Sequence, residues 1–169
     1  MSKNSEKGRR GELAATGIFS NIGVREKKFE VLRTSETTVA DDGVDIIVKC
    51  PHNTAEKFDE IVEQGSSDIA LSSTQIGVRA QVKNYSNPIT KAVAEGFVKD
   101  IEKNSNFDEH WLIGGTRLTK GAKEALDKSK NKAPIRYYSN EGFTKIQSQY
   151  PAIPFSEIND IDDDESKPE

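Results

Sequence analysis

The sequence has few of the residues that cross-link a small protein or load it with metal. Its 169 residues include one cysteine, Cys50, and two histidines, His52 and His110. This excludes an intramolecular disulfide and argues against a zinc site rich in cysteine or histidine. No apolar run approaches the roughly 20 residues of a membrane helix, and the basic start leads into no apolar signal region. We therefore expect one domain with its own hydrophobic core, in the cytoplasm.

An excess of charge of one sign is also absent from most of the sequence and occurs only near its C-terminal end. Residues 157–169 carry seven acidic side chains and one lysine, whereas the other 156 residues carry a net charge of +2. An acidic segment with so few apolar residues cannot bury enough surface to fold alone. We predict a folded domain over residues 1–156 and a disordered acidic tail over 157–169, which either keeps the protein soluble or regulates it.

Apolar periodicity predicts alternating helices and strands. Helices are expected over about 5–22 (with Gly23 as the C-cap), 88–103 and 119–130, with shorter helical stretches near 58–62 and 140–146. Strands are expected over 29–33, 44–49, 78–85, 111–115 and 134–138, and segment 51–77 has the pattern of an insertion. The first half indicates a helix followed by a meander, and the second half indicates parallel crossovers. The predicted fold class is therefore α/β, with a mixed β-sheet core and helices on both faces.

Four polar residues fall on elements that should pack together. Glu12 lies at the edge of the apolar stripe of the first helix, and Asp45 lies in the strand 44–49. Gln81 and Lys83 share one face of a later strand, because strand side chains alternate. Burial of such groups without partners costs several kcal/mol, about 2–7 for the neutral ones. Each also has an ordinary alternative as a helix-surface acid, a turn acid or the solvent face of an edge strand.

Together these residues suit phosphodiester hydrolysis with Mg²⁺, a cation that prefers oxygen ligands. Asp45 would be the anionic ligand, while the side-chain oxygen of Gln81 and the backbone carbonyl of Val82 would be neutral ligands. Lys83 would orient the attacking water or stabilise charge on the phosphate. Glu12 would hold a water or a second metal ion, and Mn²⁺ is expected to substitute for Mg²⁺.

The order of these residues resembles the PD-(D/E)XK nuclease superfamily. Glu12, Gly43-Val44-Asp45 and Gln81-Val82-Lys83 are similar to its motif, and the Gln-x-Lys variant is typical of Mrr-type restriction endonucleases. The likeness covers roughly residues 8–147 and includes the strand and helix start over 111–125. It implies a restriction-endonuclease-like fold and a Mg²⁺-dependent DNA endonuclease of restriction, defence or mobile-element biology.

Two alternatives remain. The opening Gly8-Arg-Arg-Gly-Glu is also similar to the first helix of Holliday-junction resolvases in the same superfamily, which implies a structure-selective nuclease. A non-catalytic DNA-binding or assembly subunit that keeps the fold is the other alternative, because fold alone does not imply activity.

Basic and aromatic residues near the predicted site are candidates for DNA contact, since phosphate contacts dominate affinity. They are Lys7, Arg9, Arg10, Arg79, Tyr85, Arg117 and Lys120. For Lys7, Arg9 and Arg10 the alternative is that they form the solvated surface of the first helical turn. His110 is expected to be structural. Mrr-type enzymes commonly carry a separate DNA-reading domain, for which this chain has no room. We therefore expect DNA as the partner, a homodimer, and target choice from segment 51–77, a partner protein or DNA shape.

Overall fold

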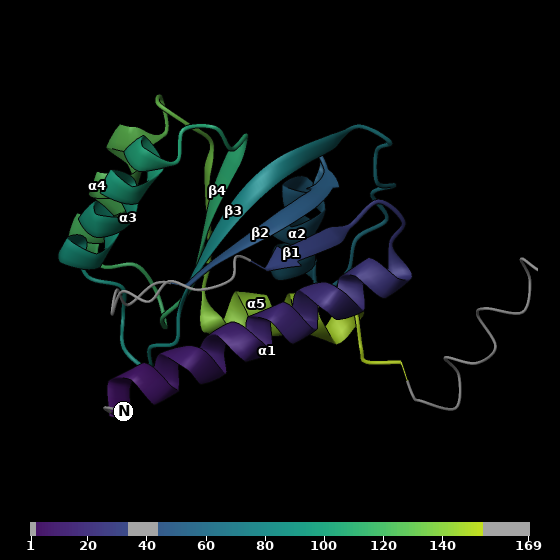
Figure 1. Cartoon of the computed structure of the whole chain (residues 1–169), viewed down its shortest axis with the longest axis horizontal. Helices are drawn as coiled ribbons and strands as arrows, with labels where there is room; N and C mark the ends of the chain where they lie inside the picture. The colour runs from purple at the N-terminus through teal and green to yellow at the C-terminus, as the bar shows by residue number, and fades with distance from the viewer. Residues whose placement is uncertain (1–2, 34–43, 154–169) are drawn as a thin grey trace, which may run out of the picture.

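The computed structural model describes residues 3–33 and 44–153, which form five helices and one five-stranded sheet (Figure 1). The helices are α1 (Lys3–Arg25), α2 (Thr54–Gln64), α3 (Lys91–Lys103), α4 (Lys120–Ser129) and α5 (Asn140–Gln149). The strands are β1 (Glu30–Arg33), β2 (Val44–Pro51), β3 (Gln75–Lys83), β4 (Glu109–Gly114) and β5 (Ile135–Tyr138). No helix among the described residues is long and apolar enough to cross a membrane.

The sheet is mixed and its strands follow the chain order β1-β2-β3-β4-β5. The first three strands form an antiparallel meander, and β3, β4 and β5 are parallel. Parallel neighbours need crossover connections, which α3 and α4 supply. This confirms the expected α/β class with a mixed sheet and helices on both faces.

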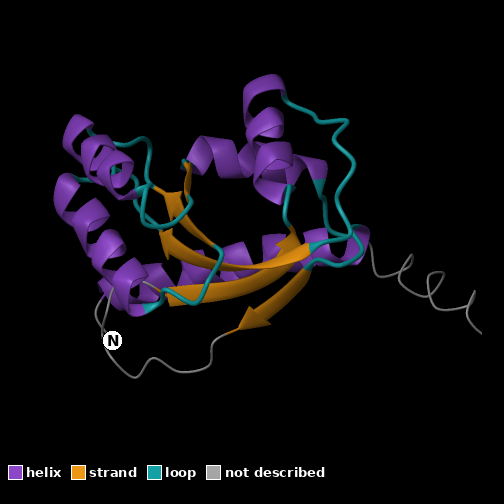
Figure 2. Ribbon diagram, turned by 90° about the horizontal axis from the view of Figure 1, so that it is seen from above, coloured by secondary structure: helices purple, strands orange, loops and turns teal. Residues whose placement is uncertain are grey.

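Helices pack around the sheet (Figure 2), and two hydrophobic clusters lie on its opposite faces. On one face, residues of α1, α2 and α5 pack around Trp111, and the rings of Phe19, Phe58 and Tyr138 have centroids 5.6–6.2 Å from the Trp111 ring. On the other face, α3 and α4 cover a smaller cluster that includes Phe97. Each helix thus buries the apolar stripe that its sequence periodicity predicts.

Three predicted boundaries were wrong. The first helix continues past Gly23 to Arg25. Strand β3 ends at Lys83, so Tyr85 lies in the following loop rather than on the strand. Helix α3 begins after its N-cap Thr90 rather than at Asn87-Pro88, because the backbone around Ile89 is hydrogen-bonded to residues 117–119. Residues 88–90, which the local pattern assigns to the start of the helix, are therefore held by hydrogen bonds to a distant segment of the chain instead.

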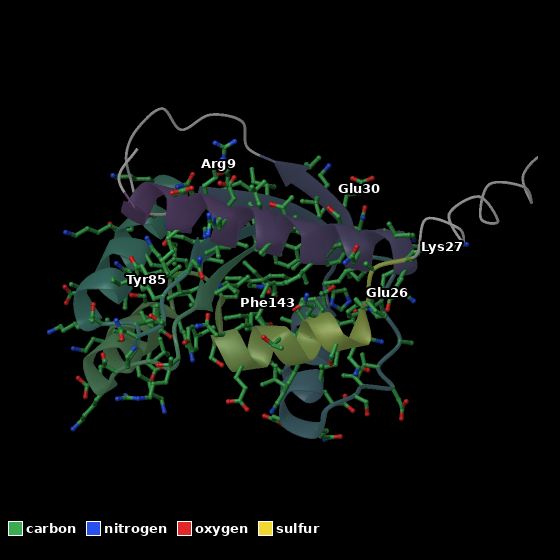
Figure 3. The ribbon with its side chains drawn as sticks, turned by 90° about the horizontal axis from the view of Figure 1, so that it is seen from below. Arg9, Glu26, Lys27, Glu30, Tyr85 and Phe143 are labelled. Atoms are coloured by element: carbon green, nitrogen blue, oxygen red, sulfur yellow. The ribbon has the colours of Figure 1, made fainter. Side chains whose placement is uncertain are left out.

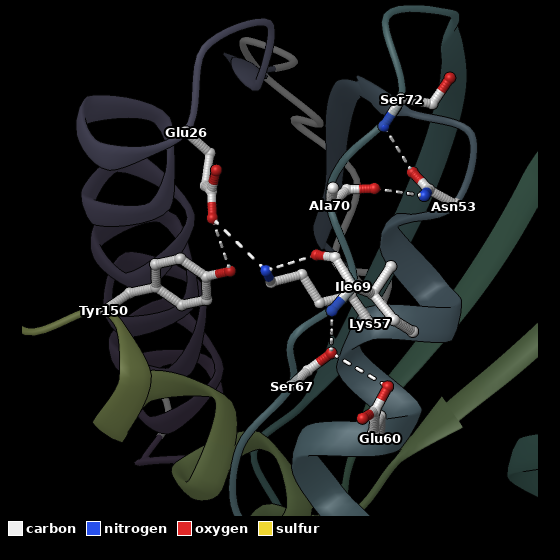
Figure 4. Close-up of polar contacts among 9 residues, drawn as sticks. All are labelled: Glu26, Asn53, Lys57, Glu60, Ser67, Ile69, Ala70, Ser72 and Tyr150. Atoms are coloured by element: carbon white, nitrogen blue, oxygen red, sulfur yellow. Dashed lines mark hydrogen bonds and ion pairs between the residues drawn. The ribbon is translucent and has the colours of Figure 1, made fainter.

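Segment 51–77 is built into the fold. Its helix α2 buries Ala55, Phe58 and Ile61 against the sheet, and β2 and β3 pair directly with each other. Hydrogen bonds hold the loop after α2: Lys57 Nζ donates to the Ile69 carbonyl at 2.8 Å, and Asn53 bonds to Ala70 and Ser72 at 2.9 Å (Figure 4). The segment therefore contributes to the core, whereas the predicted tail 157–169 lies outside the described residues.

Candidate functional site

Strand β3 lies at the centre of the sheet and has two unlike faces. Val78, Ala80 and Val82 belong to the aromatic cluster under α1, α2 and α5. The alternate residues face α3 and α4 and are polar, as strand geometry requires. With His110 of β4, they form a buried polar row whose exposed fractions are 2% for Arg79, 3% for Gln81, 8% for Lys83 and 0% for His110. The alternative of an exposed edge strand is thus wrong.

The register places Asp45 at this row. Asp45 of β2 is directly opposite Gln81 of β3 in the antiparallel pair, and Cα atoms of such opposite residues lie about 4.5–5.5 Å apart. Directly opposite residues belong to the same face of a sheet. The side chain of Asp45 lies outside the described part of the chain, so its position is given by the backbone alone.

Gln81 is oriented by a carboxylate that the sequence did not single out. Its Nε2 donates to Oδ2 of Asp100 at 3.1 Å, and a guanidinium nitrogen of Arg79 lies 3.8 Å from the same oxygen. Asp100 lies on α3, beside the buried Phe97 and Ile101. Because the amide nitrogen binds Asp100, the amide oxygen of Gln81 is the atom left for a cation. Burial of polar groups is tolerated when such bonds are made.

Lys83 ends β3 at a point where two strands come unusually close. Gly114, its register partner on β4, has φ of +127°, and a Cβ there would lie 1.8 Å from the Lys83 carbonyl oxygen. Only glycine allows this approach. Tyr137 Oη also donates to the Gly114 carbonyl at 2.7 Å, and burial raises the pKa of Tyr137 to about 12, which keeps this donor protonated. The backbone that carries Lys83 is therefore tightly held.

Glu12 reaches the same end of β3 from the other side of the sheet. It is buried, on the face of α1 that also carries Ala15 and Phe19. The next residue toward the N-terminus, Gly11, lies so close to Asn84 that an added Cβ would be 2.5 Å from the Asn84 Cβ. Since Asn84 directly follows Lys83, this contact brings Glu12 to the end of the strand that carries Gln81 and Lys83.

His110 is a buried neutral imidazole beside this row. It is the register partner of Arg79, and neither ring nitrogen has a hydrogen-bond partner among the described residues. Burial lowers its pKa to about 4, and the Arg79 guanidinium acts in the same direction. The imidazole is therefore uncharged at neutral pH, and its full burial fits the expected structural role.

The donors at this end of the sheet fit a hard cation. No cluster of three or more histidine, cysteine, aspartate or glutamate side chains that could hold a metal occurs within residues 3–33 and 44–153, insofar as their side chains are described. The candidate ligands offer oxygen atoms: the amide oxygen of Gln81, the backbone carbonyl of Val82 and the carboxylate of Asp45, a residue that the register places opposite Gln81. This is the ligand chemistry of Mg²⁺ rather than of zinc.

The candidates for DNA contact divide into four groups. Lys7 and Tyr85 line one pocket beside the end of β3. Arg9 lies on the opposite side of α1 from Tyr85 in the view of Figure 3, and Arg10 is exposed, with Glu6 3.6 Å away. Arg79 is buried beneath α3, so the structure makes it a support for Gln81 and Asp100 rather than a surface contact.

Arg117 and Lys120 are exposed and follow the carboxyl end of β4, at the same edge of the sheet as Lys83. The backbone of Arg117 accepts a hydrogen bond from Ile89 at 2.8 Å. Helix α4 starts here as expected, with Thr119 accepting from the Ala122 amide at 3.2 Å. These two cations therefore flank the segment that forms the pocket of Tyr85.

Comparison with known proteins adds no relative. No protein-family model matches the chain, and no curated protein matches it in sequence. The resemblance to PD-(D/E)XK nucleases stays a prediction that rests on the residues themselves.

Proposed function

We propose that this protein is a Mg²⁺-dependent endonuclease that hydrolyses phosphodiester bonds of DNA, in restriction, defence or mobile-element biology. The observation that supports the proposal is the buried polar row. Gln81 and Lys83 lie on one face of a central strand, Asp45 is opposite Gln81, and Glu12 reaches the same end. A fold gains nothing from burying these groups together, so a function at this end of the sheet explains them best.

Asp45, Gln81 and the Val82 carbonyl would hold the metal, with Glu12 as a further oxygen ligand for a water or a second ion. A bound Mg²⁺ polarises the phosphate and lowers the pKa of a bound water. The protein's own residues do the rest. The bond to Asp100 fixes the amide plane of Gln81, and Lys83 places a positive charge where negative charge develops on the phosphate.

The decisive experiment is plasmid cleavage. Purified protein should nick or linearise supercoiled plasmid with Mg²⁺ or Mn²⁺ and should be inactive in chelator. Asp45→Asn should abolish cleavage and leave thermal unfolding unchanged, whereas Asp127→Asn, on the exposed surface of α4, should cut normally. Full activity in chelator or in Asp45→Asn would contradict the proposal.

The same preparation separates the two alternatives. Protein that binds DNA but cuts no duplex, branched or single-stranded substrate with any divalent metal is an assembly or binding subunit. Protein that cuts branched DNA but no plain duplex is a structure-selective nuclease.

The expected oligomeric state depends on how many DNA strands the protein cuts. One site hydrolyses one strand, so a double-strand break needs two sites, most simply in a two-fold homodimer. We propose that the protein acts as a homodimer on DNA, with target choice shared with a partner protein or with segment 51–77. Light scattering with and without DNA tests this, and a strict monomer that only nicks would contradict it.

A further inference from the structure

A pocket of about 290 Å³ opens beside the end of β3, between the first turns of α1 and the start of α3. Its lining includes Lys7, Tyr85, Asn87, Pro88, Thr90 and Val93. Tyr85 lies two residues beyond Lys83, so at most about 7 Å of chain separates them. The amide of Tyr85 donates to the Lys83 carbonyl at 2.8 Å, which folds the chain back toward the site.

The pocket combines three kinds of surface. Tyr85, Pro88 and Val93 give an apolar wall, Asn87 and Thr90 offer hydrogen-bonding groups, and Lys7 provides a positive charge. Tyr85 and Val93 also pack against the cluster under α3 and α4, which braces the wall from behind. Pockets for drug-sized molecules have about 300–1,000 Å³, so this one has room for a single small ring system.

The walls are held in place before any ligand arrives. Ile89 bonds through its backbone to Arg117 and Thr119, at 2.8 and 3.0 Å. The Asn140 side chain donates to the Tyr85 carbonyl at 2.7 Å, and the Asn84 side chain donates to the Lys7 carbonyl at 2.8 Å. Binding to such a site loses little freedom of the protein, which favours affinity.

The charge around the pocket favours an anionic polymer. Lys7 lines it, and Arg117 and Lys120 are exposed on the neighbouring loop and helix start. Aromatic rings bind bases by stacking, whatever the sequence, and lysines bind the adjoining phosphates. A base within a duplex cannot enter such a pocket, because it is paired and stacked.

We propose that this pocket binds one unpaired nucleobase of DNA, stacked on Tyr85, with the adjoining phosphate on Lys7 and the next phosphodiester toward Lys83. The site then selects DNA with an unpaired nucleotide beside the bond to be cut, as at a bulge, a frayed end or a branch. This rests on the proposed function for its biological meaning, and it names the substrate class of the same site.

Binding without cleavage tests the pocket. Full-length Asp45→Asn protein is titrated in chelator with a hairpin duplex, and with the same duplex carrying one unpaired 2-aminopurine. The bulged DNA should bind at least about tenfold more tightly than the paired DNA, and the 2-aminopurine fluorescence should be quenched on binding. Because no cleavage is measured, failure of the nuclease proposal leaves this result unaffected.

Variants assign the preference to the pocket. In the same Asp45→Asn background, Tyr85→Ala should bind both DNAs equally, and Tyr85→Phe should keep the preference. Val93→Trp, which fills the pocket and leaves Tyr85 in place, should also remove it, so the test stands even if Tyr85→Ala folds poorly. Lys7→Gln should lower the salt dependence of binding by about one ion, unlike Lys128→Gln at the far end of α4.

Two results would overturn the proposal. One is equal affinity of the parent protein for paired and bulged DNA. The other is a preference for bulged DNA that survives both Tyr85→Ala and Val93→Trp. Either would exclude an unpaired base as the ligand of this pocket.

Discussion

The two faces of strand β3 carry opposite chemistry. Val78, Ala80 and Val82 pack into an aromatic cluster, where burial itself stabilises the fold. Gln81 and Lys83, which alternate with them along the same backbone, are also buried, on the other face, and are polar. The apolar side chains of β3 therefore stabilise one face of the strand, and the candidate site occupies the other, beside the smaller cluster under α3 and α4. This difference teaches that burial alone does not distinguish a core residue from a candidate site residue. Buried polar side chains on a face that helices cover are the more informative signal.

The largest effect is expected from the backbone that supports the polar face. Gly114→Ala places a Cβ 1.8 Å from the Lys83 carbonyl at a φ of +127°, and neither strand can move without breaking the sheet. We expect more than about 4 kcal/mol of destabilisation, measured by urea unfolding. Gly96→Ala is the control: it lies in α3 with open space around it and should stabilise by about 0.5–1 kcal/mol. Equal effects of the two would contradict the close approach of β3 and β4.

The sharpest contrast between the faces is expected in DNA cleavage, the activity that we propose. Lys83→Ala should lower cleavage about 10²–10³-fold, the usual cost of removing one group that stabilises transition-state charge. DNA binding should change little. Val78→Ala, fully buried on the opposite face, should instead lower stability by about 1–2 kcal/mol and leave the cleavage rate of the folded protein unchanged. Cleavage kinetics and unfolding of both variants make the comparison, and a Lys83→Ala enzyme of normal rate would refute it.

A pH effect on stability is expected from His110 on the polar face. His110 has a pKa of about 4 in the fold and about 6.5 when unfolded. As pH falls from about 6.5 to 4, the unfolded chain takes up a proton that the folded chain does not, so stability is lost by up to about 3 kcal/mol. Urea unfolding across this range should show a smaller loss for His110→Leu. If the free energy of unfolding falls equally with pH in wild type and His110→Leu, groups other than His110 cause the acid sensitivity.

The smallest effect concerns the helix that covers the polar face. Asp100→Ala removes the carboxylate that binds Gln81 and lies 3.8 Å from Arg79. We expect the free energy of unfolding to fall by about 1–3 kcal/mol. Cleavage should also fall, because the Gln81 amide loses the carboxylate that orients it. Asp100→Asn keeps an acceptor and should cost less, and Lys99→Ala on the exposed side of α3 should be neutral. A stability equal to that of wild type for Asp100→Ala would show that Gln81 is held by other contacts.

Much of the fold, and the arrangement of some candidate site residues, could be predicted from the sequence. The apolar stripe of residues 15–22 and the alternation of residues 78–83 were sufficient to predict a helix and a central strand, because both depend on periods within one element. The same alternation put Gln81 and Lys83 on one face, and β2 does align Asp45 with Gln81. The resemblance to a nuclease motif named Glu12 as well, and the structure brings Glu12 to the same strand end.

The tertiary structure decided the rest. Asp100 had no signal of its own on the helix, because its role depends on the distance between α3 and β3. Lys7 and Tyr85 are 78 positions apart in the sequence and share a pocket only because Gly11 lets α1 lie against Asn84. Local patterns report which residues one element buries. Which buried polar group meets which partner is set by the packing of elements far apart in the chain, and no short-range period encodes it.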